Sequence, residues 1–95
     1  MAVSITLGPP DVVTLTTTWS LVTWSPVSAR QLVITAPSTT DVYLGASVAE
    51  GGAVSGDYHV VAAGTVQAID VSGLPSTEVG LAVATGADVR VWATR

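Results

Sequence analysis

Alternation of apolar and polar residues along short, punctuated segments is the feature that most constrains this chain. Seventeen valines and thirteen threonines occur among its 95 residues, and β-branched side chains of this kind favour the pleated backbone of a strand. Glycine and proline interrupt the chain at short intervals, as turns do in all-β domains. The pattern therefore predicts an all-β fold in which no segment reads convincingly as a helix.

About eight strands are expected. They cover residues 3–7, 12–24, 30–36, 41–47, 58–63, 65–71, 79–83 and 89–93. A chain of this length forms one domain, which we expect to span residues 1–95. The predicted fold is a small β-sandwich of about eight strands, with jelly-roll-like or Greek-key connections.

The second of these segments carries the clearest alternation. Thr17, Trp19 and Leu21 follow Val13 and Leu15 at alternate positions, so all five are expected to point toward the core. The phase then slips between Leu21 and Val22, and we expect a bulge or bend there because one residue of offset exchanges the two faces. Trp19 is predicted to be a core residue, whereas the face that Trp24 occupies stays open.

Two further structural expectations come from the alternation. Leu32 and Ile34 are predicted to point inward from their strand. The segments 79–83 and 89–93 are expected to form a closing hairpin, because residues 85–88 provide a short connection of suitable turn residues.

Composition excludes several classes of protein. Hydrophobic residues make up 48% of the chain and charged residues only 11%, and there is no cysteine or lysine. Disorder requires low hydrophobicity and high charge, and disulfide scaffolds and cysteine-based zinc modules require cysteine. Three arginines and a net charge of −4 argue against nucleic-acid binding through a basic surface.

A membrane-spanning helix is not expected, although the mean hydropathy is +0.58. Such a helix needs about 20 predominantly apolar residues in succession, and the longest strictly hydrophobic runs here are 60–63 and 81–84. Residues 1–5 lack the basic and apolar regions of a secretory signal. We therefore expect synthesis in the cytoplasm and no membrane association.

No enzyme is predicted. A Ser-His-Asp triad would have to use His59, the single histidine, and the chain lacks the Gly-x-Ser-x-Gly turn that presents a nucleophilic serine in many hydrolases. One histidine without cysteine also makes a transition-metal site improbable. A surface or structural role for His59 is the favoured interpretation.

The carboxylates are scattered along the chain, mostly at expected strand ends and turns. They are Asp11, Asp41, Glu50, Asp57, Asp70, Glu78 and Asp88. Acidic side chains at such places accept local backbone hydrogen bonds. Glu50 and Asp57 bracket a glycine-containing loop where they could share Ca²⁺, but no Asp-x-Asp-x-Asp-Gly pattern supports this. No cofactor is predicted.

Three segments together carry a family resemblance. Residues 41–45 read Asp-Val-Tyr-Leu-Gly, residues 63–71 read Ala-Gly-Thr-Val-Gln-Ala-Ile-Asp-Val, and residues 86–92 read Gly-Ala-Asp-Val-Arg-Val-Trp. In this order they resemble small virion proteins of tailed bacteriophages, which occur as capsid decoration proteins or as modules of head and tail fibres. The resemblance covers about Leu32 to Arg95 and departs from the family pattern at residues 79–82.

This resemblance implies a structural role in the virion. The chain would be a capsid decoration (cementing) protein, made in the host cytoplasm and located on the capsid surface. It would bind the major capsid protein as a homotrimer and stabilise the expanded shell. The alternative is a tail or fibre adhesion module that binds carbohydrate on the host surface.

The low charge supports assembly independently of the resemblance. A free small domain usually disperses its surface with charged residues, and flat, neutral strands tend to pair at their edges unless a partner covers them. Residues 2–7, set off by Gly8-Pro9-Pro10, form either an arm that adds a strand to a neighbouring subunit or an ordinary first strand. In the arm, Val3, Ile5 and Leu7 are the candidate contacts.

Aromatic residues supply the other candidate partner contacts, namely Tyr43, Tyr58 and Trp92. Trp92 lies in the polar phase of the last strand. We favour burial of Trp92 within the fold or an oligomer, because tryptophan is highly buried on average. A free ligand platform is the alternative.

Overall fold

The protein, seen in a computed structural model, is an all-β sandwich, as the sequence predicts. The structure describes residues 3–6, 11–25, 30–46, 48–72 and 78–94. These residues form nine strands, one more than the approximate number expected. The strands are β1 (Val3–Thr6), β2 (Asp11–Leu15), β3 (Ser20–Ser25), β4 (Gln31–Thr35), β5 (Val42–Gly45), β6 (His59–Val61), β7 (Val66–Asp70), β8 (Glu78–Val83) and β9 (Ala87–Thr94).

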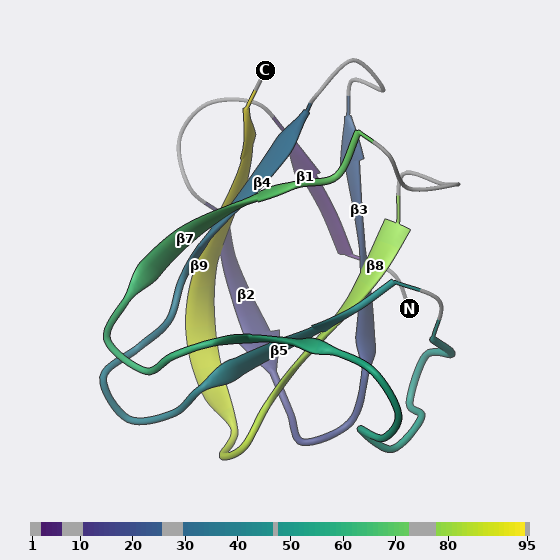
Figure 1. The fold of residues 1–95 in the computed structure, drawn as a ribbon, viewed down its shortest axis with the longest axis vertical. Coiled ribbons are helices and arrows are strands. Elements are labelled where there is room, and N and C mark those ends of the chain that lie inside the picture. The colour runs from purple at the N-terminus through teal and green to yellow at the C-terminus, as the bar shows by residue number, and fades with distance from the viewer. Residues whose placement is uncertain (1–2, 7–10, 26–29, 47, 73–77, 95) are drawn as a thin grey trace.

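The strands form two sheets that face each other (Figure 1). The five-strand sheet has the order β1-β3-β8-β5-β6, and the four-strand sheet has the order β2-β9-β4-β7. All pairings are antiparallel except the parallel pairing of β1 with β3. Consecutive strands lie in opposite sheets except β5 and β6. This alternation, with β2-β9-β4-β7 opposite β3-β8-β5-β6, is the jelly-roll order, and β1 is an addition to it.

The core lies between the two sheets and is built by the predicted period of two. Leu32 and Ile34 of β4 are fully buried, which confirms their inward direction. They pack with alternate residues of the other strands, chiefly valines and leucines. The buried core residues are Val13, Leu15, Val22, Trp24, Leu32, Ile34, Ala36, Val42, Leu44, Val61, Val71, Val79, Leu81, Val83, Val89, Val91 and Ala93.

The expectation of one strand over residues 12–24 is wrong. The segment contains β2 in the four-strand sheet and β3 in the five-strand sheet, so the phase slip marks a crossing between sheets rather than a bulge. The crossing leaves Thr17 exposed and places Leu21 half-buried on the outer side of its sheet, whereas Trp24 enters the core. The hydroxyls of Thr16 and Thr18 lie 3.2 Å apart within the crossing.

The expected hairpin between 79–83 and 89–93 is also wrong. β8 pairs with β3 and β5, while β9 pairs with β2 and β4. The short link at residues 84–86 therefore joins the two sheets instead of joining two neighbours in one sheet. Thr40 holds this link, because its buried hydroxyl oxygen accepts hydrogen bonds from the backbone N–H groups of Ala84 and Thr85, both at 3.1 Å.

Candidate functional site

The outer surface of the four-strand sheet is one of the two outer surfaces of the sandwich. Directly opposed residues of antiparallel strands share a face, so the register assigns its members. We call it the outer four-strand face. It consists of Val12, Thr14, Gln31, Val33, Thr35, Val66, Ala68, Asp70, Asp88, Arg90, Trp92 and Thr94.

Trp92 lies near the middle of this face. Its register partner on β4 is Val33, which in turn pairs with Ala68 on β7. The three residues form an apolar row across the strands, in which Trp92 and Val33 are half-buried and Ala68 is exposed. Trp92 therefore occupies the outward face that the sequence predicts, partly covered by its own sheet.

The edges of the same face carry exposed valines and little charge. Val12 on β2 and Val66 on β7 are each 61% exposed. Among the described residues of the face, the charged side chains are Asp70, Asp88 and Arg90, and the Asp88 carboxylate accepts a hydrogen bond from the Thr14 hydroxyl at 2.8 Å. The outer four-strand face is thus mostly neutral, with apolar residues accessible at both sides.

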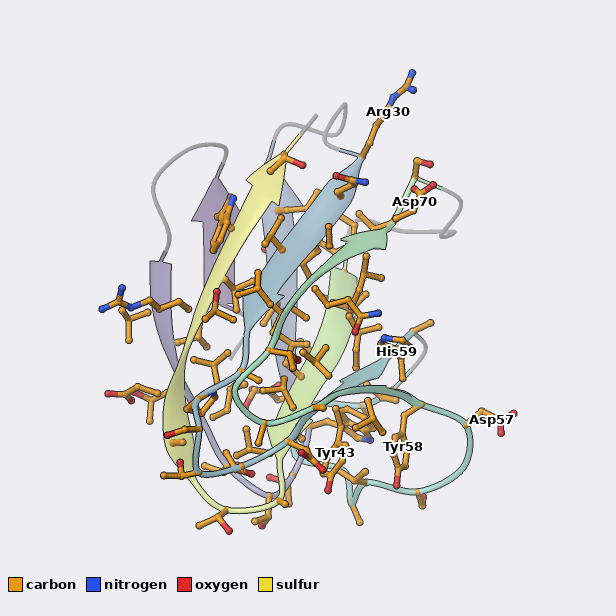
Figure 2. The ribbon with its side chains drawn as sticks, turned by 60° about the vertical axis from the view of Figure 1, so that its left-hand side comes forward. Arg30, Tyr43, Asp57, Tyr58, His59 and Asp70 are labelled. Carbon is orange, nitrogen blue, oxygen red and sulfur yellow. The ribbon has the colours of Figure 1, made fainter. Side chains whose placement is uncertain are left out.

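The opposite surface, on the five-strand sheet, carries an aromatic cluster made of Trp19, Tyr43 and Tyr58. The Tyr43 and Tyr58 ring centres are 5.1 Å apart and the rings are tilted, while Tyr58 meets Trp19 edge-on at 6.3 Å. Figure 2 shows the two tyrosines side by side at one end of the molecule. Tyr58 is 41% exposed and Trp19 is buried, so the cluster covers the sheet and exposes only its tyrosines.

Residues 48–58, which belong to the connection between β5 and β6, are tied to Trp19 by backbone hydrogen bonds. The Trp19 N–H donates to the Gly52 carbonyl at 2.9 Å, and the Gly51 N–H donates to the Trp19 carbonyl at 2.7 Å. The Leu21 N–H donates to the Glu50 carboxylate at 2.6 Å. Trp19 is therefore buried beneath this connection, outside the central core in which sequence reasoning placed it.

Two strand glycines make room for the Trp19 ring. A Cβ atom at Gly45 or at Gly80 would lie 3.1 Å from ring carbons of Trp19, and at either position it would also overlap a methyl group of Val48. Glycine inside a strand often marks a place where another group approaches closely. Gly45 and Gly80 were thus the available sequence signal for a second packed layer, which the strand analysis missed.

The N-terminal strand pairs with its own chain. Val3 lies in register with Val22, and Ile5 with Trp24, as β1 runs parallel to β3. Within this chain, β1 is thus an edge strand of the five-strand sheet, and its addition to a neighbouring subunit stays a prediction. Leu7, the third candidate contact of this segment, lies outside the described residues.

The groups considered for catalysis or metal binding are dispersed. His59 is exposed on β6, where it pairs with Leu44. Over the described ranges there is no pocket, and no three histidine or acidic side chains come together as a metal site would require. Glu50 binds the Leu21 N–H and Asp41 accepts a hydrogen bond from the Ala63 N–H at 2.8 Å. In the same part of the chain, no helix is long and apolar enough to cross a membrane.

Asp70 has the clearest electrostatic environment on the outer four-strand face. The hydroxyl and the backbone N–H of Ser72 donate to its carboxylate at 2.7 and 2.9 Å. These hydrogen bonds, with a smaller contribution from the charge of Arg30, hold the pKa of Asp70 below its ordinary value. Figure 2 shows Arg30 and Asp70 at the same end of the molecule.

Replacing Asp70 with asparagine is expected to lower stability only where the carboxylate is ionised. A lowered pKa in the folded state contributes stability above the ordinary carboxyl pKa, and this contribution is lost as the pH falls through the lowered value. The melting temperature of Asp70→Asn should therefore fall below that of the parent at neutral pH, and the two should converge at acid pH, as the pH falls through the lowered pKa of Asp70. A difference that stays the same at both pH values would contradict this prediction. The effect is small because the group is exposed.

The protein is thus a small jelly-roll domain. Its outer four-strand face is mostly uncharged, and the outer surface of the five-strand sheet carries the aromatic cluster. No protein-family model matches the sequence, and comparisons with curated proteins and with solved structures found no match. These two surfaces are therefore the features that indicate its function.

Proposed function

We propose that the chain is a bacteriophage capsid decoration protein that binds the major capsid protein through the outer four-strand face. The observation that carries the proposal is the chemistry of that face, which exposes Val12 and Val66 at its sides and a half-buried Trp92 near its middle. Interface cores are depleted in charge and enriched in aromatic residues. Jelly-roll domains are also common in viral capsids, which agrees with the sequence resemblance.

Binding would stabilise the shell by mass action. A protein that binds only the expanded shell lowers the free energy of that state and therefore raises the temperature at which it breaks. The neutral face suits this task because it can be covered without burying many unpaired charges.

The test measures binding of the purified chain to expanded shells that lack it, together with the melting temperature of those shells. Val12→Lys should weaken binding by about tenfold or more, because an unpaired ammonium group becomes buried. Val60→Lys is the matched control, since Val60 is 43% exposed on the opposite sheet and should bind like the parent. Failure of the parent chain to bind shells, or equal loss in both variants, would overturn the proposal.

A tail or fibre module that binds host carbohydrate is the second candidate. It is favoured by the aromatic cluster, because the exposed Tyr58 ring next to Tyr43 offers an apolar surface of the kind that stacks on sugars. The two functions differ in copy number. A particle map with many copies spread over the shell would support decoration, whereas a few copies confined to the tail would support the carbohydrate-binding candidate.

A further inference from the structure

β7 provides an open pairing edge of the sandwich that is longer than the edges of β1 (four residues) and β6 (three residues) in the other sheet. β7 is the last strand of the four-strand sheet, and no described strand lies beyond it. The other edge of that sheet, β2, has β1 packed close to it, and the edge strand β6 has only three residues. β7 has five residues and pairs with β4 over all five without a bulge.

The hydrogen-bonding direction of β7 follows from the bonds that flank it. The Ala36 N–H donates to the Thr65 carbonyl at 2.9 Å, and the Val71 N–H donates to the Arg30 carbonyl at 2.8 Å. Alternate residues of an antiparallel strand turn their backbone groups toward the same neighbour. Odd-numbered residues of this segment therefore face β4, and the backbone N–H and C=O groups of Val66, Ala68 and Asp70 face outward.

Natural edge strands are usually protected against pairing with other chains. Lysine, proline, bulges and inward-pointing charges are the common devices. β7 reads Val66-Gln67-Ala68-Ile69-Asp70 and has none of the first three, while its single charge, Asp70, lies at one end on the outer face. Its exposed backbone groups are thus open to another strand.

We propose that the chain forms a two-fold symmetric dimer in which β7 pairs antiparallel with β7 of a second copy. Centred on Ala68, this register opposes the smallest side chain of the strand to itself, and it opposes Val66 to Asp70 of the second copy. The outward backbone groups of three residues on each strand then exchange hydrogen bonds. The four-strand sheets of the two copies become one continuous eight-strand sheet.

Charge favours the antiparallel arrangement over a parallel one. Parallel pairing in register would place the Asp70 carboxylates of the two copies side by side, which destabilises a sheet. In the antiparallel register they are four residues apart along the strand direction, or about 14 Å at the usual rise. This exceeds the screening length of about 8 Å at physiological ionic strength, so their repulsion is weak. The strand is therefore compatible with a second copy of itself.

Ala68→Lys tests the pairing, because two ammonium groups would oppose each other at the two-fold axis. We expect the parent chain to sediment as a dimer, and the dissociation constant of Ala68→Lys to rise by about tenfold or more. Val60→Lys is the matched control, since it adds the same charge to an exposed position on an edge strand of the other sheet, and it should remain dimeric.

A mixture of variants separates lost pairing from lost folding. The Ala68→Glu variant should also be monomeric when it is measured alone. An equimolar mixture of Ala68→Lys and Ala68→Glu should give a mixed dimer, detected by native mass spectrometry. A monomeric parent chain would overturn the proposal, as would the homotrimer that the family resemblance implies or an Ala68→Lys variant that stays dimeric. The dimer does not depend on the proposed capsid function, because sedimentation is measured without shells.

Discussion

Trp19→Ala is expected to lower the free energy of unfolding by about 3 to 5 kcal/mol, the usual range for removing a buried large aromatic side chain. Trp19 is only 3% exposed, and its ring fills the space above Gly45 and Gly80. Its loss leaves a cavity between the five-strand sheet and residues 48–58. The free energy is measured by equilibrium denaturation in urea.

Hydrogen exchange supplies a local readout for the same variant. The amides of Trp19, Leu21 and Gly51 donate hydrogen bonds between residues 19–21 and residues 48–58, and they should lose protection in Trp19→Ala more than the amides of β4 do. Trp19→Phe is the control, because it keeps a ring at the site and should cost less. Uniform loss of protection over all strands would contradict a role in anchoring this connection.

Gly80→Ala is expected to cost about 2 to 3 kcal/mol, within the range for overpacking a filled site. The added methyl group would overlap Val48 and lie 3.1 Å from the Trp19 ring, so the ring and Val48 must move away from the sheet. For a domain of this size, each kcal/mol lowers the melting temperature by roughly 4 to 8 °C. Thermal unfolding followed by circular dichroism measures the shift.

Gly86→Ala is the matched control for this substitution. The nearest atom to a Cβ at Gly86 is the Leu15 carbonyl oxygen at 3.6 Å, an ordinary van der Waals distance, and the backbone there is not in the left-handed region. Gly86→Ala should therefore change stability by no more than about 0.5 kcal/mol. If both variants melt together with the parent, the packing of Trp19 against Gly80 is not tight.

Alternation made the strands and their inward residues predictable. Side chains of a strand alternate between its two faces, so the apolar residues at alternate positions identify the face toward the core. The buried residues Leu32, Ile34, Val42 and Leu44 follow this rule. The sheet to which each strand belongs was not predictable in the same way. A strand that crosses to the other sheet and a strand that bends within its own sheet give the same slip in phase, as residues 12–24 illustrate.

The position of Trp19 could not be predicted by assuming that buried residues lie only between two sheets. Its phase matched that of Val13 and Leu15, and a buried tryptophan is expected in a core. The pattern carries no sign that residues 48–58 form a second packed layer outside the sheet, except for the glycines that leave space under the ring. Outward placement of Trp92 was predictable, because no crossing interrupts β9 between Ala87 and Thr94.

The connection order of the strands has a consequence for synthesis. β8 and β9 are the last of the nine strands in chain order, yet each lies inside its sheet, where β9 joins β2 to β4 and β8 joins β3 to β5. Asp11 meets Val91 across such a pair. While the ribosome is still making residues 78–94, neither sheet can be completed, and pairings over such long separations form slowly. The domain therefore folds late, after nearly all of its strands have left the ribosome.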